Sequence, residues 1–489
     1  MLFNSHIFML LFLPLLLAGW YFLNWKKKFQ LAQGYLIGMS LWFYAYANLQ
    51  YLWLLLFSCL IGWLLSCLPE KISSEKGKKV LTGVGCVFHL GLLGYFKYSN
   101  FFLENLNTAF HTDFPMLQIL LPVGISFYTF QQLAYLIDRC RKDAPRDSFF
   151  DYLTFMVYFP QLLQGPILLR SEFMEQLKEP ERRRFHAERF SEGIQFFVFG
   201  LAKKVLLADT LAKAVNYGYS NVSMLDSISA LLLAVGYLTE LYFDFSGYCD
   251  MAVGLGKMIG LEVAENFDAP FHSASVKEFW RRWHMTLGRF FTRYVYIPLG
   301  GNRRGKMRTL CNVMIVMLLS GLWHGAAWTF VLWGFLHGVG MIWDNLEHPH
   351  LPKKWMRQAA TFAYVCMTFV FFRAESIAQG VDVLKSIVSL KWNGFVFQMA
   401  SALDLTEFYM ITKALSMKLP GLLSWFWLGI FVVLIAICFR VLSGEKVSGV
   451  VALQRQKGYG RLYPVLLAVL FTWSMISMTG VSEYLYFSF

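Results

Sequence analysis

One histidine lies in a setting where ionisable side chains are rare. His324 follows Trp323 in an apolar run over 310–344, between Gly321 and Gly325. An ionisable group inside such a segment is costly to bury, which makes it a candidate functional residue. The two small residues would let a helix or a ligand approach closely. An imidazole removed from water stays neutral, so His324 would be available as a general base. The alternative is a structural histidine that bonds a nearby carbonyl.

A second histidine, His284, lies in the segment 279–301, FWRRWHMTLGRFFTRYVYIPLGG. At 100° per residue, its arginines at 282, 289 and 293 fall within about 40° of one another, while His284 shares the opposite side with the aromatic residues. This pattern predicts an amphipathic helix at the cytoplasmic interface. Such helices often serve only as anchors. An anchor has no use for an inward histidine, so His284 is the second candidate.

The end of this segment is a flexible basic loop over 300–306. Its candidates for binding a phosphate-bearing group are Asn302, Arg303 and Arg304. Basic loops are common on cytoplasmic faces, and the loop alone is a weak signal.

The sequence contains none of the common motifs of other catalytic chemistries. It contains no G-x-S-x-G elbow, no H-E-x-x-H, no Walker A run and no D-x-D pair. The eight cysteines lie mostly in apolar runs without a C-x-x-C, which is typical of buried small side chains and not of a metal site or a disulfide framework. Any chemistry must therefore be carried by histidine, with neither a metal nor a serine nucleophile.

The composition explains where these residues must lie. Of the 489 residues, 57% are hydrophobic and only 15% are charged, against about 25% in a soluble protein. Too few polar residues remain to cover soluble domains. The formal charge of +13 comes from short clusters between apolar runs, which is the positive-inside pattern and not a nucleic-acid-binding surface. The sequence predicts a polytopic, all-α membrane protein.

Apolar runs and loop charges predict the topology. Runs near 6–25, 31–68 (two spans), 80–98, 117–137, 190–215, 228–246, 310–344, 358–372, 421–439 and 463–480 give roughly ten or eleven crossings. The loops 71–79, 139–146 and 440–461 are basic and are expected on the cytoplasmic side, whereas 99–116 and 216–227 contain no Lys or Arg. The first run precedes its basic cluster, so the N-terminus is expected outside. The last run follows the basic loop 440–461, so the C-terminus is expected outside as well.

Two segments break this alternation. The apolar stretch 149–169 has basic residues on both sides and contains Pro160 and Pro166, so a re-entrant hairpin is expected. A kinked span with a misjudged flank is the alternative. The run 310–344 would be about 50 Å long as one helix, too long for a roughly 30 Å hydrocarbon core. Two short helices that meet near His324 solve that problem.

Several short motifs, taken together, resemble one family. They are YFPQ (158–161), GPI (165–167), DFSGY (244–248), DMA (250–252), ENF (265–267), WH (283–284), YIPLGGNR (296–303), LWHGA (322–326) and LHG (336–338). They resemble the membrane-bound O-acyltransferases, in the bacterial branch that acetylates polysaccharides such as alginate. The resemblance extends over more than half of the chain.

The resemblance implies one membrane-embedded catalytic domain over 1–489, with helices around a central tunnel. N-terminal helices would occupy 1–148, a catalytic core 149–345, and C-terminal helices with an outer aromatic tail 346–489. His324 would match the family's invariant histidine in the tunnel, and His284 would match a second histidine on the cytoplasmic side. Gln161, Gln164 and Trp323 are expected to line the cavity, whereas His337 matches a family position that is structural in the simplest interpretation.

The resemblance also implies the reaction. The donor would be a cytoplasmic acyl thioester such as acetyl-CoA, used as a co-substrate with no permanently bound cofactor. The acyl group would cross the bacterial cytoplasmic membrane to a hydroxyl of an extracytoplasmic polysaccharide or to a partner O-acetyltransferase. The tail residues Tyr484, Tyr486, Phe487 and Phe489 resemble the branch's motif for handing the group onward.

Three alternatives remain open. A D-alanyl transfer protein of teichoic acid modification would keep the fold and change the cargo, although the aromatic tail and the YIPLGGNR run argue against it. A transporter or flippase would use broken helices without covalent chemistry, but no internal repeat is visible. A non-catalytic scaffold would leave both inward histidines without a role.

Overall fold

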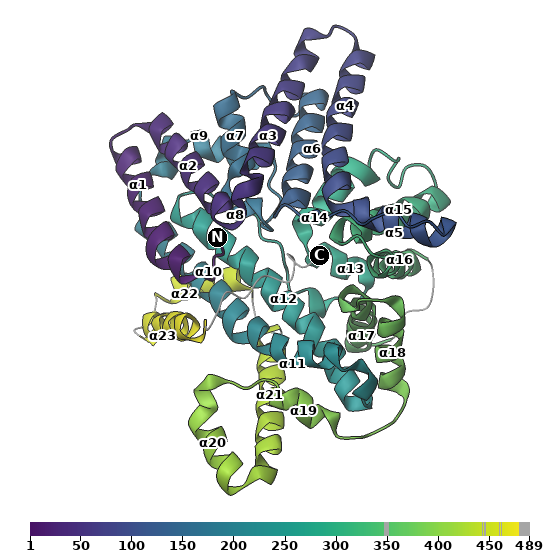
Figure 1. Cartoon of the computed structure of the whole chain (residues 1–489). Helices are drawn as coiled ribbons and strands as arrows, with labels where there is room; N and C mark the ends of the chain where they lie inside the picture. Colours follow the sequence, from purple (N-terminus) through teal and green to yellow (C-terminus); the bar gives the residue numbers. More distant parts are fainter. Residues whose placement is uncertain (347–351, 443, 445, 459, 461, 479–489) are drawn as a thin grey trace. The chain divides into compact units, whose positions relative to one another are not determined.

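The computed structural model describes residues 1–346, 352–442, 444, 446–458, 460 and 462–478 (Figure 1). Over these residues the secondary structure is helical and contains no strand. The chain forms two compact units, interleaved along the sequence. Unit 1 comprises 1–197, 248–265 and 286–298, and unit 2 comprises 198–247, 266–285 and 299–489. The chain passes from one unit to the other inside α10, α12 and α14, after residue 265 and after residue 298. The single domain over 1–489 stays a prediction.

The helices of unit 1 are α1 (Leu13–Trp25), α2 (Phe29–Asn48), α3 (Leu52–Cys67), α4 (Glu75–Leu93), α5 (Ser99–Phe110), α6 (Ile125–Arg141), α7 (Phe149–Val157), α8 (Phe159–Leu162), α9 (Arg170–Lys178), most of α10 (Ala187–Ala202) and most of α14 (Met285–Phe291). Those of unit 2 are α11 (Asp209–Ser220), most of α12 (Ser227–Met258), α13 (Val276–Arg282), α15 (Lys306–His324), α16 (Trp328–Trp343), α17 (Lys354–Arg373), α18 (Ile377–Val388), α19 (Phe395–Ser401), α20 (Tyr409–Lys418), α21 (Pro420–Leu442), α22 (Val447–Lys457) and α23 (Leu462–Ser477). Short π-helical segments lie at η1 (Phe8–Phe12), η4 (Gly94–Tyr98), η6 (Lys203–Ala208) and η9 (Thr292–Tyr296), and short 3-10 segments at η2 (Leu49–Tyr51), η3 (Leu68–Lys71), η5 (Pro180–Arg183), η7 (Val222–Met224), η8 (Pro270–His272) and η10 (Thr406–Phe408).

The prediction of a polytopic all-α membrane protein is confirmed. Within the described residues, six stretches are long and apolar enough to cross a bilayer: 8–25, 49–70, 75–110, 227–258, 306–324 and 420–442. Two shorter apolar helices, α16 and α23, add to them. The remaining crossings of the expected ten or eleven stay predictions.

In unit 1, α3, α4 and α6 pack side by side, as Figure 1 shows. The run predicted to begin at 117 becomes helical only at Ile125, so its expected start is wrong. The cause is local, because Pro122 cannot donate a backbone N–H and Gly124 takes φ +78°. A Cβ on Gly124 would overlap the Leu162 carbonyl oxygen, so a larger residue cannot replace it.

The expected helix break over 149–169 is present in unit 1. Helix α7 ends at Val157 and α8 lasts only four residues before an irregular stretch leads to α9. The stretch is buried, and its turn requires Gly165, where a Cβ would overlap the Pro160 carbonyl oxygen. Non-helical backbone at membrane depth is tolerated only when protein or a cavity surrounds it. Whether the segment re-enters the membrane stays a prediction.

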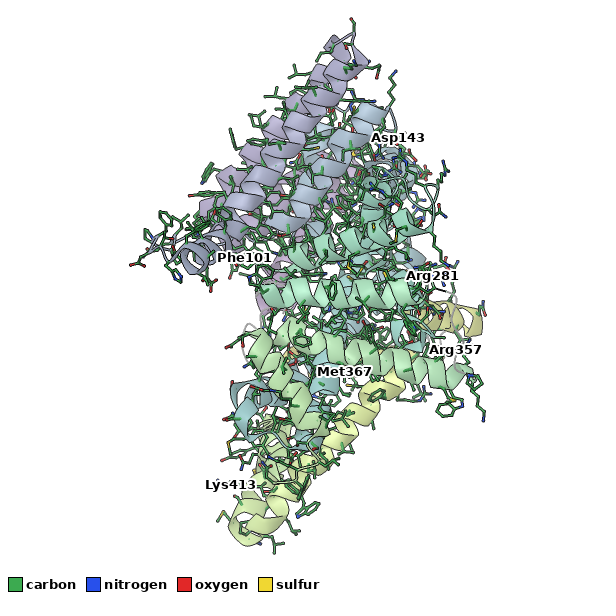
Figure 2. All side chains as sticks on the ribbon, turned by 90° about the vertical axis from the view of Figure 1, so that its right-hand side faces the viewer. Phe101, Asp143, Arg281, Arg357, Met367 and Lys413 are labelled. Carbon is green, nitrogen blue, oxygen red and sulfur yellow. The ribbon has the colours of Figure 1, made fainter. Side chains whose placement is uncertain are left out.

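In unit 2, the run 310–344 forms two helices, as predicted. Helix α15 ends at His324, and α16 begins at Trp328 after three extended or turning residues. Glycines hold the two helices close together, since a Cβ on Gly321 would overlap the Phe330 carbonyl oxygen and one on Gly334 would lie 2.5 Å from that of Met317. Helix α17 packs on α16. Figure 2 shows α17 lengthwise, with Arg357 near one end, on the same edge of the view as Arg281, and Met367 further along.

Unit 2 also buries a group of charges. Lys204 in η6 lies 2.5 Å from Asp244 in α12 and 2.8 Å from Asp209 at the start of α11, and both Lys204 and Asp244 are buried. The pair Lys204–Asp244 joins residues 40 positions apart, and together with Asp209 it fixes the register of η6, α11 and α12. Breaking such a pair by removing one partner leaves an uncompensated charge inside the protein.

We therefore expect Lys204→Met to lower the free energy of unfolding by about 3–5 kcal/mol, because Asp244 would lose its partner. The measurement is thermal unfolding of the purified protein in detergent. Lys213→Met, on the exposed face of the same region, is the matched control and should leave the transition within about 0.5 kcal/mol. Equal transitions for the two variants would show that the buried pair does not stabilise the fold.

Candidate active site

His324 lies at the last residue of α15, inside an aromatic enclosure in unit 2. Its side chain is 4% exposed. Its ring centroid lies 5.0 Å from that of Trp323, 5.1 Å from Trp333 and 5.2 Å from Phe372, in each case edge to face. The predicted place of His324 at the meeting point of two short helices is correct. Trp323 lies beside it, as expected of a residue of the same site.

His284 lies in a break between α13 and α14, and the prediction of one continuous amphipathic helix is wrong here. Trp283 is extended and His284 takes φ +46°, in the left-handed region that costs a residue with a side chain about 1–2 kcal/mol. The segment after α12 satisfies the backbone groups that the break exposes. The Met285 N–H donates to the Asn266 carbonyl at 2.9 Å, and the Asp268 N–H donates to the Arg282 carbonyl at 2.9 Å.

The arginine face predicted for this segment serves ion pairs. Arg282 pairs with Glu278 in α13 at 2.9 Å. In unit 1, Arg289 binds both carboxylate oxygens of Glu172, and Arg293 lies 3.0 Å from Asp138. Arg282 thus stabilises its own helix, whereas Arg289 and Arg293 join segments of unit 1 that are distant in the sequence, which the helical-wheel pattern did not reveal.

The side chain of His284 is held in one tautomer. Its Nδ1 lies 3.2 Å from Oδ1 of Asn266, and because an amide oxygen can only accept, Nδ1 carries the proton. The ring packs edge to face on Phe245, with 4.7 Å between centroids, and the side chain is 1% exposed. Burial lowers the pKa of His284 to about 3, so the ring is neutral near pH 7.

The two predicted histidines come together in unit 2. The ring centroids of His284 and His324 lie 6.5 Å apart, and Trp323 contacts both rings. Two buried imidazoles at this separation, in surroundings of low polarity, are suited to moving a proton to and from a group placed between or beside them. Such a pair could therefore support proton transfer in hydroxyl or thiol chemistry.

His337 is held at both of its ring nitrogens. The Trp280 indole N–H donates to Nδ1 at 3.2 Å, so Nε2 carries the proton, and Nε2 lies 3.0 Å from Oγ1 of Thr368. The side chain is fully buried and packs on Trp333, with 4.8 Å between ring centroids. A histidine bonded in this way is suited to fixing its neighbours, which matches the structural interpretation of this position.

The basic loop lies at the surface of unit 2. The side chains of Asn302, Arg303 and Arg304 are exposed, and within the described residues neither arginine forms an ion pair. The loop backbone is fixed from below, where the buried Asn312 in α15 donates to the Gly301 carbonyl at 2.9 Å. The loop can thus present two guanidinium groups to an incoming anion.

Gln161 and Gln164 lie in unit 1, and both are buried. Gln161 donates to the Phe155 carbonyl at 2.5 Å, and this bond caps the end of the broken helix. Neither amide atom of Gln164 has a hydrogen-bond partner among the described residues. Unsatisfied buried amides are rare and are expected beside water or a ligand. Their role in lining a cavity stays a prediction.

The remaining predicted site residues form the C-terminal tail. Tyr484, Tyr486, Phe487 and Phe489 lie outside the described residues, so their role in handing the acyl group onward stays a prediction. A metal centre was not expected, and no group of three His, Cys, Asp or Glu side chains in the described part of the chain is placed to hold a metal ion.

Four residues that the sequence analysis did not name as site residues contact His284 or His324. They are Phe245, Asn266, Trp333 and Phe372. The motif ENF signalled Asn266, although it gave no indication that this side chain would bond His284. Nothing in the sequence marks Phe372, which reaches the site only through the packing of α17 on α16.

Comparisons with known proteins show which family the chain is similar to. The family model described as "MBOAT, membrane-bound O-acyltransferase family" matches residues 143–379, which include both histidines and the basic loop. The peptidoglycan O-acetyltransferase of Helicobacter pylori is 35% identical over 423 residues, 80% of each chain. The probable alginate O-acetylase AlgI of Azotobacter vinelandii is 40% identical over 389 residues, 77% of this chain and 76% of that protein. A teichoic acid D-alanyltransferase of Streptococcus thermophilus is 28% identical over 253 residues, 49% of this chain and 58% of that protein.

The buried state of His284 makes stability depend on pH in a definite direction. An unfolded histidine takes up a proton near pH 6.5, whereas the folded one does so only near pH 3. The unfolded chain therefore binds more protons below pH 6.5, and the stability that the neutral His284 contributes is lost progressively as the pH falls from 6.5 toward 3.

We expect His284→Gln to flatten this dependence of stability on pH between pH 7 and pH 5, measured by thermal unfolding. The control His186→Gln, at an exposed histidine, should keep the wild-type slope, and an unchanged slope in His284→Gln would contradict the assignment.

Proposed function

The chain belongs to the membrane-bound O-acyltransferase family, and from this premise we propose that it moves an acetyl group from a cytoplasmic thioester to a hydroxyl beyond the membrane. The donor is acetyl-CoA or another acyl thioester, used as a co-substrate without a permanently bound cofactor. The acceptor is an extracytoplasmic polysaccharide or a partner O-acetyltransferase that delivers the group to one. The protein is a multi-pass membrane protein, and its proposed location is the bacterial cytoplasmic membrane with both termini outside.

The observation that carries the proposal is the buried pair His324 and His284 at 6.5 Å, next to aromatic rings. Neither a serine nucleophile nor a metal is needed for acyl transfer by a histidine base. The two named O-acetyl relatives, at 35% and 40% identity over more than three quarters of this chain, favour acetyl as the acyl group. The names of these relatives specify peptidoglycan and alginate, so a glycan hydroxyl is the acceptor class that we propose.

In the proposed reaction, His324 removes the proton from the attacking hydroxyl as its oxygen bonds to the thioester carbonyl carbon. Collapse of the intermediate breaks the C–S bond, and the thiolate takes the proton from His324. The neutral His284, with its proton on Nδ1, leaves Nε2 as the ring atom able to accept a bond, and it can thereby orient the attacking hydroxyl or the protonated base. The aromatic enclosure excludes water, which would otherwise hydrolyse the thioester.

The exposed loop with Asn302, Arg303 and Arg304 is the proposed contact for the phosphate groups of the donor. Guanidinium groups bind phosphate in two-point geometry and stay charged at every physiological pH. Gln161, Gln164 and Trp323 are proposed to line the path of the acyl group, and the aromatic tail to deliver it outside.

Replacing His324 tests the proposal directly. Purified protein in liposomes receives labelled acetyl-CoA, and label on the protein, a partner or a glycan is counted. His324→Ala should lower the transfer rate by roughly 10²–10⁴, the usual contribution of a general base. Exposed His186→Ala is the matched control and should transfer at the wild-type rate. Equal rates in wild type and His324→Ala would remove His324 from the mechanism.

The same assay also distinguishes between the possible acyl donors. If no acetyl transfer occurs in the wild type but D-alanyl transfer from a phosphopantetheine carrier does, the cargo is D-alanine. If neither transfer occurs and a glycan or lipid still binds, the result favours a transporter or a different acyl donor.

The donor loop predicts a phosphate-specific defect. Arg303→Ala with Arg304→Ala should raise KM for acetyl-CoA about tenfold or more, since each bond to a charged group contributes about 1.5–3 kcal/mol. KM for acetyl-pantetheine, which carries no phosphate, should stay unchanged. Lys385→Ala, at an exposed lysine of α18, serves as the control. A similar rise in KM for both thioesters would show that the loop does not act by binding phosphate.

A further inference from the structure

Trp333 has an unusual position beside His324. Its side chain is 1% exposed, and its indole N–H has no hydrogen-bond partner among the residues that the structure describes. Buried tryptophans almost always find an acceptor for this group, because leaving a donor unsatisfied costs about 1–3 kcal/mol. A buried donor left open next to a reactive imidazole indicates that the acceptor is supplied by a bound molecule.

The ring of Trp333 is held from several sides. It packs edge to face on His324 at 5.1 Å and on Phe372 at 5.0 Å between centroids. His337, itself fixed by two hydrogen bonds, lies 4.8 Å away on the same helix. The backbone next to Trp333 is held against α15 by the close contact at Gly334. The donor is thus positioned before any substrate arrives, which is the condition under which a donor can stabilise developing charge without reorganisation.

We propose that the indole N–H of Trp333 is the oxyanion donor of the acyl transfer. The inference rests on the proposed function and goes beyond it, since it assigns a second catalytic residue and names the atom that it contacts. That atom is the carbonyl oxygen of the thioester.

The step can be written with its atoms. The acceptor oxygen forms a bond to the carbonyl carbon, the hydroxyl proton passes to His324, and the carbonyl π electrons move to the oxygen. The Trp333 N–H donates to this oxygen as its negative charge develops. When the intermediate collapses, the C=O bond re-forms, the C–S bond breaks, and the thiolate takes the proton from His324. Nothing is oxidised or reduced.

The surroundings favour a neutral donor. The enclosure consists of aromatic rings, and in a site of low polarity one hydrogen bond to an oxyanion is stronger than in water. A cation there would bind the ground-state carbonyl and would need its own partner when the site is empty. The indole N–H is fixed by its ring and carries no charge, so it can remain without an acceptor in the empty site at a modest cost in free energy.

The test removes the N–H and keeps the ring. At position 333, tryptophan is replaced by 3-benzothienylalanine through suppression of a stop codon, so that sulfur takes the place of the N–H in a ring of nearly the same shape. Trp333→Phe is the conventional companion variant. Trp427→Phe, at a buried tryptophan of α21 remote in sequence from the site, controls for the loss of an indole as such. Each protein is assayed with acetyl-CoA and with an analogue whose carbonyl oxygen is replaced by sulfur, a poor hydrogen-bond acceptor.

We expect the benzothienyl variant to lose about 10²–10³ in kcat with acetyl-CoA, the usual effect of removing an oxyanion donor. KM and the melting temperature should change little. The wild type should lose rate with the sulfur analogue, and this penalty should be at least tenfold smaller in the variant, because the bond is already absent. A role of the ring in packing alone would leave the oxygen-to-sulfur penalty equal in both proteins.

Two outcomes overturn the inference while leaving the proposed function intact. One is a benzothienyl variant as active as the wild type. The other is an equal oxygen-to-sulfur penalty in the two proteins. If the wild type transfers acyl groups from neither thioester, the proposed function itself fails, and the wild-type assay alone reveals this.

Discussion

A polar group buried inside the protein has no water to bond, and this constraint determines how the protein builds its site. Each buried charge and each break in a helix must be satisfied by another part of the same chain. Lys204 meets two carboxylates in unit 2, and Arg170 binds both carboxylate oxygens of Asp147 in unit 1. These bonds allow polar residues to remain inside a chain whose composition is dominated by apolar side chains.

The same constraint explains the two breaks that create the site in unit 2. At His284, residues 266–268 supply a carbonyl and an N–H to the interrupted backbone, and the side chain of Asn266 fixes the imidazole. At His324, close packing through Gly321 and Gly334 lets two short helices replace one long helix. In both cases the interruption of the helix brings the histidine to a position that a regular helix would not provide. The strained φ of His284 is compensated by these bonds.

The sequence predicted the parts of this arrangement that depend on composition and length. Too few charges, apolar runs near 20 residues and a run over 310–344 interrupted by glycines were enough for the all-α membrane class and for the break near His324. The ends of the helices were harder to predict from the sequence, as the late start of α6 at Ile125 shows. Gly124 is required there by its contact with the Leu162 carbonyl, a contact between segments distant in the chain. Periodicity also failed over 279–301, because a single helical wheel cannot show that the Asn266 carbonyl accepts from the backbone N–H after the break. The wheel predicted an interfacial helix that could serve as an anchor, but its arginines form ion pairs with Glu278, Glu172 and Asp138.

The histidines of unit 2 show why residue type alone did not separate the proposed catalytic position from a structural one. His324 and His337 lie on neighbouring helices and both are buried. His337 accepts a hydrogen bond from Trp280 at one nitrogen and donates to Thr368 from the other, so both nitrogens hold its own ring in place. That ring packs on Trp333, whose own N–H is left open beside His324 among the residues that the structure describes. A satisfied histidine therefore packs against a tryptophan whose N–H no described residue binds, and this difference follows from which polar atoms the fold pairs.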